Sequence, residues 1–185
     1  MAGKNIEDVR VGVDGIISTG VFDTAVAPTS AVSSLGATWS DLGYASEDGV
    51  TETTEQSTSV LRAWQNRKKV RTLVEEGTVR YQMTLIQTNA ETVAFYYGGT
   101  VDTTDGSIVI DPTRERPVLA FNIDVIDGDS IVRAYAPEAQ VVEVGDQVYA
   151  NGEPIGYEVT VECSYNEELG GSVKKWYTDL IVEAP

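Results

Sequence analysis

The stretch Ile155-Gly-Tyr-Glu-Val-Thr-Val-Glu-Cys-Ser-Tyr165 decides the fold class of this sequence. Isoleucine, tyrosine, valine and cysteine occupy every second position, and glycine, glutamate, threonine and serine occupy the positions between them. Because successive side chains of a β-strand point to opposite faces, this period of two predicts a strand with one buried and one solvated face. Cys163 falls on the face expected to be buried.

The same alternation extends outward through the chain. Thr78–Gln87 and Val118–Val125 alternate in this way, and Asp127-Gly128 supplies a tight turn into Ile131–Ala136. Shorter strands are expected at Val9–Val13, Trp39–Tyr44, Val70–Glu75, Ile108–Ile110, Ala139–Val144 and Val173–Ile181. So many strands predict a mainly β protein.

One segment breaks the pattern. Asn89 is a good N-cap residue, Glu91 suits the positive end of a helix dipole, and Gly98 provides a C-terminal stop. The apolar residues between them recur at helical spacing. We therefore expect one short helix at about 90–97, lying across the sheets.

Length and composition fit one globular domain. The chain has 185 residues, of which 42% are hydrophobic and 23% charged, close to the average for globular proteins. Its single cysteine excludes an internal disulfide and suits assembly in a reducing cytoplasm. The first ten residues lack a secretory pattern, and no apolar run could span a bilayer, so we expect a soluble protein without a membrane partner.

The charge balance narrows the classes of function. The chain carries 29 Asp and Glu against 13 Lys and Arg, for a formal net charge of −16. A surface of this kind repels phosphate backbones, which disfavours tight nucleic-acid binding. The chain also contains no histidine, which removes imidazole catalysis and the commonest zinc ligand.

No motif predicts a catalytic or metal site. Asp124–Asp129 lacks the ligand spacing of a calcium loop, and its Asp-Gly pair fits a hairpin turn. Asp102–Gly106 is interpreted in the same way. The sequence has no nucleophile elbow and no phosphate-binding glycine loop. We therefore expect neither an enzyme nor a bound cofactor.

A short basic segment interrupts the acidic chain. Between Arg62 and Arg80, six basic residues face two acidic ones, whereas Val11 to Leu61 contains seven acidic residues and no basic one. With Trp64, this cluster is compatible with nucleic acid, with an anionic membrane or with a protected strand edge. It also complements the acidic remainder of the same molecule, which favours head-to-tail contacts between copies.

The segment before the basic cluster supports contacts between copies. Gly49–Ser59 is rich in threonine and lacks the pattern of a core, so we expect a long loop that becomes ordered on a neighbour. The residues expected to contact other subunits are Glu52, Glu55, Leu61, Arg62, Trp64, Arg67, Lys68, Lys69 and Arg71.

Several stretches together resemble one protein family. They are Trp39-Ser-Asp-Leu-Gly-Tyr-Ala-Ser-Glu-Asp-Gly-Val50, Thr51-Glu-Thr-Thr-Glu55, Ala63-Trp-Gln65, Val70-Arg71, Thr84–Val93, Tyr96-Tyr-Gly98, Val13–Ile17 and Ala27-Pro-Thr29. In order and spacing they resemble the major tail (tail tube) proteins of long non-contractile-tailed, siphovirus-type bacteriophages. The similarity is greatest to the proteins of actinobacterial phages and covers most of residues 9–165.

The resemblance implies a fold and a division of the chain. The family fold consists of two packed antiparallel sheets, a β-sandwich or barrel, with one short flanking helix, which agrees with the strands and helix predicted from the residues. By position, a single tail-tube domain would span residues 1–185. Within it we expect an N-terminal arm at about 1–38, a long inter-ring loop at about 47–69 and a C-terminal strand or arm at about 170–185.

The resemblance also implies a function. Six copies would form a ring whose inner strands join into a β-barrel, and rings would stack into a tube through which the genome is ejected into the host. Partners would be other copies, tape-measure, tail-tip and terminator proteins during assembly in the host cytoplasm, and passing double-stranded DNA without sequence-specific binding. The alternatives are a ring-forming baseplate, tail-tip or secretion-tube protein, or a carbohydrate- or receptor-binding β-sandwich.

Alternation in the predicted strands gives candidates for the lumen wall. These residues lie on the polar faces of three predicted strands, and a channel for DNA would expose such a face. They are Asn122, Asp124, Arg133, Glu158, Thr160 and Glu162.

Overall fold

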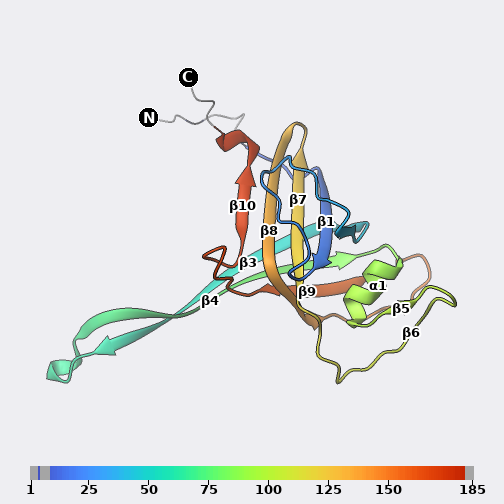
Figure 1. Cartoon of the computed structure of the whole chain (residues 1–185). Coiled ribbons are helices and arrows are strands. Elements are labelled where there is room, and N and C mark those ends of the chain that lie inside the picture. Colours follow the sequence, from blue (N-terminus) through green and yellow to red (C-terminus); the bar gives the residue numbers. More distant parts are fainter. Residues whose placement is uncertain (1–3, 5–8, 182–185) are drawn as a thin grey trace.

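The computed structural model describes residue 4 and residues 9–181 (Figure 1). Its strands are β1 (Asp14–Val21), β2 (Trp39–Asp41), β3 (Ala45–Arg62), β4 (Lys69–Leu85), β5 (Val101–Asp102), β6 (Ser107–Ile108), β7 (Leu119–Asp127), β8 (Ser130–Val144), β9 (Tyr157–Cys163) and β10 (Lys174–Tyr177). Helix α1 (Ala90–Tyr97) and the 3₁₀ turns η2 (Gln65–Arg67) and η3 (Thr178–Leu180) complete the described elements.

The strands form two antiparallel sheets within the described residues. The large sheet has eight strands in the order β2-β1-β7-β8-β9-β4-β3, with β10 also paired to β8, and the small sheet is the β5-β6 hairpin. The predicted fold class, mainly β with antiparallel sheets and one short α-helix, is confirmed.

Strand β8 belongs to both halves of the large sheet. Its first part pairs with β7 and β10, and its last part, from Ala139 to Val144, pairs with β9. The β7–β8 register shifts between Leu119 and Phe121, close to Pro137 on β8. In Figure 1, β1, β7 and β10 run across the direction of β3, β4 and β9. The sheet therefore folds over on itself and encloses a core, as in orthogonally packed sheets.

The core lies between the two halves of this sheet. Phe121 of one half and Leu85, Val159 and Val161 of the other are almost fully buried and belong to one cluster. Phe95 of α1 stacks on Phe121, with ring centroids 6.4 Å apart. The period of two in β9 is confirmed, because its apolar residues are buried and the polar residues between them are only half-buried.

Helix α1 begins and ends at the residues that the sequence predicts. The Asn89 side chain accepts a hydrogen bond from the Thr92 backbone N–H at 2.7 Å, and Gly98 takes the left-handed conformation at φ 68°. The buried Thr92 hydroxyl donates to the Leu42 carbonyl at 2.6 Å and so ties the helix to the chain after β2.

Four predictions of local structure need correction. Residues 9–13 are not a strand, and the N-terminal region predicted as an arm contributes β1 to the sheet. Two pairs of predicted strands are continuous, as β4 and as β8. The segment predicted as a loop at 47–69 is mostly a hairpin of β3 and β4, because backbone pairing with β4 and the β propensity of threonine hold it extended. Residues 1–3, 5–8 and 182–185, within the predicted terminal arms, lie outside the described residues.

No helix in the described part of the chain is long and apolar enough to cross a membrane.

Candidate assembly surface

The β3–β4 hairpin extends far beyond the body of the molecule. Strand β4 pairs with β9 only as far as Val79, so that over residues 55–78 the two hairpin strands pair only with each other. We call residues 55–78 the arm. Figure 1 shows it as a narrow projection away from the folded sheet. Nearly every residue of the arm is exposed.

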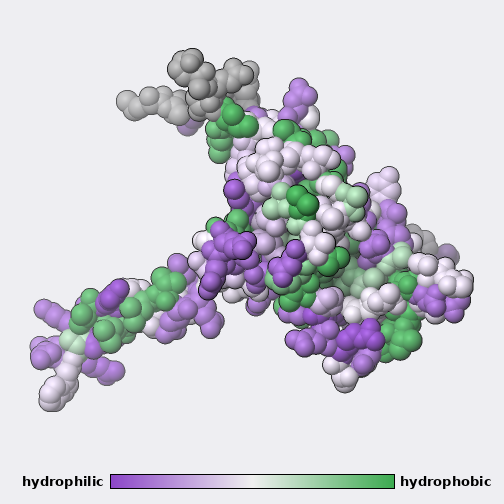
Figure 2. All heavy atoms as spheres, viewed as in Figure 1, coloured by the Kyte–Doolittle hydropathy of each residue, from purple (hydrophilic) through white to green (hydrophobic). Residues whose placement is uncertain are grey.

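The arm exposes apolar side chains on both faces. The strand register places Val60, Val70 and Val74 on one face, and Leu61 and Leu73 on the other. All five are exposed, and Figure 2 shows hydrophobic residues along the arm between hydrophilic ones. An isolated two-stranded hairpin is marginally stable in water. Side chains of this kind are therefore available for a partner to cover.

The tip of the arm combines an aromatic ring with positive charge. Trp64 is 96% exposed, the highest value among the large hydrophobic residues. It precedes η2, where Asn66 and Arg67 turn the chain with φ of 53° and 54°. The remaining basic residues of the tip are Arg62, Lys68, Lys69 and Arg71. The structure thus gathers seven of the nine residues predicted to contact other subunits at one end of the arm.

The other two predicted contact residues lie at the root of the arm. Glu52 forms an ion pair with Lys175 of β10, which connects the start of the hairpin to the other half of the sheet. Glu55 faces Thr78 where the arm begins. Neither residue belongs to the tip.

The polar face of β4 and β9 contains three of the lumen candidates. Glu158, Thr160 and Glu162 alternate with buried residues on β9 and lie half-buried on the outer face. Glu162 accepts a hydrogen bond from the Arg80 Nε at 2.8 Å, and Glu158 accepts one from the Gln82 side chain at 2.7 Å.

Arg80 is a residue of this polar face that the sequence analysis missed. Its hydrogen bond to Glu162 raises the pKa of the guanidinium, so Arg80 stays positively charged and offsets part of the negative charge. The signal was present, because the alternation of residues 78–87 already points Arg80 and Gln82 outward. What the sequence could not supply was the register that pairs them with Glu162 and Thr160.

The other three lumen candidates are buried inside the subunit. Asn122 is 0% exposed, and Asp124 and Arg133 form a bidentate ion pair with distances of 2.6 Å and 2.7 Å. The third guanidinium nitrogen of Arg133, Nη1, donates to the carbonyls of Ser30 and Ser33 at 3.0 Å and 2.5 Å.

The prediction that Asn122, Asp124 and Arg133 line a lumen is therefore wrong. Alternation correctly placed polar residues on one face of β7 and β8, but the chain between β1 and β2 covers that face. Nothing in the strand pattern reports such a cover.

The acidic turns have structural roles. Asp102, Asp105 and Asp111 each accept a hydrogen bond from the backbone N–H two residues ahead, at 2.8 Å, 3.0 Å and 2.9 Å. Hydrogen bonds of this kind stabilise turns, and they lower the pKa of all three carboxyl groups. Across residues 9–181, no cluster of three or more Asp, Glu or Cys side chains is arranged to hold a metal ion.

Comparisons of three-dimensional structure give low similarities. The chain is similar to a chain of the virion of the native gene transfer agent particle, with a TM-score of 0.41, 11% identity, and 95% and 99% of the two chains covered. A chain of the anti-feeding prophage baseplate, 6-fold symmetrised, gives a TM-score of 0.41 and 12% identity over 86% and 91%. No curated protein matches the sequence.

A family model gives the assignment. The model for phage tail tube proteins matches residues 2–183. Because it spans nearly the whole chain, this chain belongs to the phage tail tube protein family and is a structural component of a virion tail rather than an enzyme.

Proposed function

We propose that this subunit polymerises through its arm into stacked rings, six copies to a ring, and that the stack is the tube through which a phage genome passes. The observation that carries the proposal is the arm itself, which is long, apolar on both faces and basic at its tip. Exposed apolar side chains on a projecting hairpin usually mark a site that another protein covers, as in a subunit that binds its neighbours.

The length of the arm suits a contact between rings. Eight residues from Glu55 to Arg62 reach roughly 27 Å at about 3.4 Å per residue of antiparallel strand. That distance takes Trp64 and the basic residues well beyond the body of their own subunit. Packing against an adjacent ring would cover the exposed valines and leucines, which the arm cannot do alone.

Charge complementarity supports the same contact. The tip carries five basic residues, while the molecule as a whole has a net charge of −16. A basic tip is therefore attracted to the acidic surface of another copy and repelled by another tip, which favours head-to-tail stacking. Part of this attraction is exposed to solvent, so we expect high salt to weaken assembly.

The edges of the large sheet suit contacts within a ring. Strand β3 is an edge strand in the described structure, with β4 on one side and no strand on the other. Unpaired edges readily pair with another chain. Pairing between copies would join the sheets containing β3, β4 and β9 into the closed barrel that the family resemblance implies.

The outer face of β4 and β9 would then form the wall of the channel. Glu158, Thr160 and Glu162 give it acidic and hydroxyl groups, and Arg80 partly balances them. A wall of this composition repels DNA phosphates and offers few groups that bind them, so DNA would slide past without sequence-specific contacts. A tape-measure protein would occupy the same channel during assembly.

Electron microscopy of purified protein tests the proposal. At high protein concentration, the unmodified chain is expected to form long hollow tubes. The variant Lys68→Glu/Lys69→Glu is expected to lose stacking, because reversed charges at the tip face an acidic partner surface. The variant Arg114→Glu/Lys174→Glu makes the same change in net charge away from the arm and should still form tubes. Normal tubes from the tip variant would remove the tip from the interface.

The micrographs also separate the alternatives. Isolated rings without stacks would favour a baseplate or tail-tip role. Featureless monomers would favour a carbohydrate- or receptor-binding module, which would need a surface of exposed aromatic rings. Trp176 does not provide one, because its ring packs against Tyr135 at a centroid distance of 6.5 Å and the Lys174 ammonium lies 4.9 Å from its centroid.

A further inference from the structure

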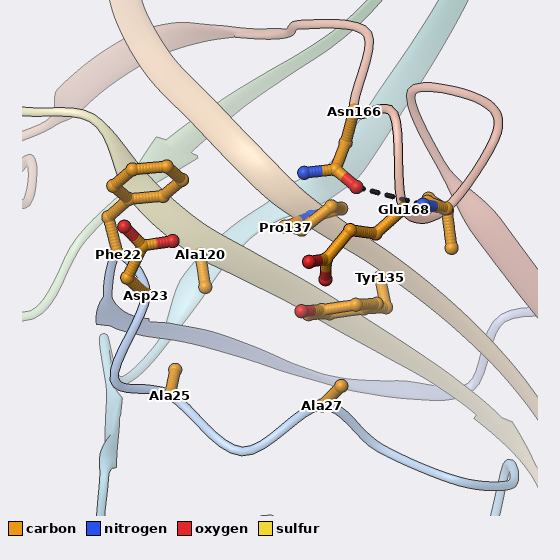
Figure 3. A pocket seen from close by; sticks show the side chains of 10 residues that line it. Phe22, Asp23, Ala25, Ala27, Ala120, Tyr135, Pro137, Asn166 and Glu168 are labelled. Atoms are coloured by element: carbon orange, nitrogen blue, oxygen red, sulfur yellow. Dashed lines mark hydrogen bonds between the residues drawn. The ribbon is translucent and has the colours of Figure 1, made fainter.

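A cavity of about 310 Å³ opens between the chain after β1, strand β8 and the loop before β10 (Figure 3). Small or apolar residues, including Phe22, Ala27 and Ala120, share its walls with polar residues that expose more of the wall surface. Two carboxylates, Asp23 and Glu168, line it from different segments. The volume is at the small end of ligand pockets, which run from about 300 Å³ upward, and suits one large side chain.

Tyr135 places an unpartnered hydroxyl group in this cavity. Its side chain is only 7% exposed, yet its hydroxyl makes no hydrogen bond within the described residues. Trp39 and Trp176 contact the ring at centroid distances of 6.0 Å and 6.5 Å, and Figure 3 shows the hydroxyl directed into the cavity. Unlike the Tyr81 hydroxyl, the Tyr135 hydroxyl is not a fully buried atom; it is open to solvent, and an occupant of the cavity can take the place of that solvent as its hydrogen-bond partner.

The cavity is braced by hydrogen bonds on both sides. The Asn166 side chain accepts from the Leu169 N–H at 2.8 Å and donates to Glu138 at 2.7 Å, which fixes the loop that carries Glu168. On the opposite side, the Trp39 indole donates to the Val26 carbonyl at 3.0 Å. A pocket held in this way can accept a side chain without first being ordered.

The chemistry of the cavity matches the tip of the arm. The pocket offers apolar residues, two carboxylates and a free hydroxyl, and no basic residue lines it. The tip offers the most exposed aromatic ring of the molecule, Trp64, with basic residues on either side of it. An indole N–H can donate to the Tyr135 hydroxyl or to Glu168, and the neighbouring ammonium or guanidinium groups can pair with the carboxylates.

We propose that this pocket receives the arm tip of a second copy of the chain, with Trp64 in the cavity and the tip's basic residues against Asp23 and Glu168. The arm projects away from the subunit that bears it, so the occupant comes from another subunit (Figure 1). This proposal rests on the proposed assembly function and names the acceptor of the contact.

Disulfide trapping tests the contact directly. Gln65→Cys subunits, which keep Trp64, are mixed with Ala27→Cys subunits under assembly conditions and oxidised, and the native Cys163 is buried. A disulfide requires Cα atoms within about 7 Å. We therefore expect covalent dimers on a non-reducing gel. Gln65→Cys mixed with Glu153→Cys, an exposed site outside the pocket, should give none.

The result separates this proposal from the proposed function. Tubes without a disulfide between the cysteines at positions 65 and 27 would overturn the docking site and leave the tube intact. The disulfide without tubes would support the docking site and count against the tube.

Charge reversal in the pocket gives a second test. Glu168→Lys is expected to raise the protein concentration needed for polymerisation at least tenfold, and adding Lys68→Glu in the same chain should restore part of the loss. Glu153→Lys is the control with the same charge change. Unchanged polymerisation of Glu168→Lys, with circular dichroism confirming the fold, would overturn the site.

Discussion

At the scale of single residues, the buried ion pair of Asp124 and Arg133 holds the chain between β1 and β2 on the sheet. The two charges are held by two short hydrogen bonds, and the guanidinium also satisfies the carbonyls of Ser30 and Ser33. The pair thus fixes the chain between β1 and β2 on the sheet at Ser30 and Ser33. Residues predicted to face a channel serve instead to hold the subunit together.

Removing the cation of this pair should destabilise the subunit strongly. Arg133→Met leaves Asp124 as a buried charge without its partner, and such losses typically cost about 3–5 kcal/mol of unfolding free energy. Urea denaturation of the free subunit measures the change. Arg114→Met, on the surface, should change it by less than about 0.5 kcal/mol. A small effect at Arg133 would mean that water or a neighbour solvates Asp124.

The single thiol should be inert in the folded subunit. Burial, with smaller contributions from the charges of Glu52 and Glu162, raises the pKa of Cys163 to about 12. Almost no reactive thiolate is therefore present at pH 8, because the pH lies far below that pKa. A thiol reagent such as a maleimide should label the native protein very slowly and label the protein in urea rapidly. Rapid labelling of the native form would contradict the packing of β9.

At the scale of elements, the local sequence was enough to predict a helix or strand where neighbouring residues determine it. Helix α1 was predictable to the residue, because Asn89 and Gly98 cap it within the local sequence. Strand β9 was predictable because one of its faces is buried and the other is polar, and β7 shows the same alternation of apolar and polar residues although both of its faces are buried between Ala120 and Asp124. Residues 49–59 have no buried face, so no alternation marks them, and only pairing with β4 makes them a strand.

The pattern of a strand also cannot show whether another segment of the chain packs over one of its faces. The period of two in β7 identified a polar face at Asn122 and Asp124. A polar face fits a water-filled channel, but it fits equally well a covering loop whose backbone groups need hydrogen-bond partners. The contact residues at Arg62–Arg71 stay a prediction; their charge and aromatic character need no knowledge of the fold, and the structure adds that they lie at the exposed end of the arm. The Tyr135 pocket was not predictable, since four segments that are distant in the sequence form it.

The arm should be the site most sensitive to protease in the free subunit. Its basic residues lie at an exposed tip with no other element packed over them. Trypsin is therefore expected to cut at Arg67, Lys68 or Lys69 first, leaving the body intact. In assembled tubes the same bonds should be protected, while a site such as Arg114 keeps its sensitivity. Gel electrophoresis with mass spectrometry of the fragments measures both, and equal cleavage in both forms would leave the arm outside the interface.

At the scale of the whole molecule, acidic and basic residues lie on different parts of the surface. The body is acidic and the arm tip is basic, so one molecule carries both sides of an electrostatic contact with its own copies. The acidic wall proposed at β4 and β9 uses the same excess charge for a different purpose, which is to keep DNA from binding. Net charge alone disfavours tight binding of nucleic acid, and the distribution of the charge adds the distinction between a bound ligand and DNA that only passes through.

Reversing the wall charges should affect transit of DNA but not assembly. Glu158→Lys with Glu162→Lys turns part of the proposed wall basic, so DNA phosphates would be retained by attraction. In phage particles carrying this protein, we expect normal tails and slower ejection. The rate of ejection is measured as the amount of DNA released over time. Glu153→Lys with Glu115→Lys makes the same change in charge away from β9 and from the pocket. Ejection at the normal rate in the first variant would exclude this face as the channel wall.

The central claim is that the arm joins subunits of successive rings. Cryo-electron microscopy of polymers grown from the purified, unmodified chain tests it most directly. The expected image is a hollow tube of stacked rings in which residues 55–78 of each subunit cross to the adjacent ring and their apolar side chains are covered. Tubes whose arms end in solvent, or a protein that stays monomeric at high concentration, would contradict it.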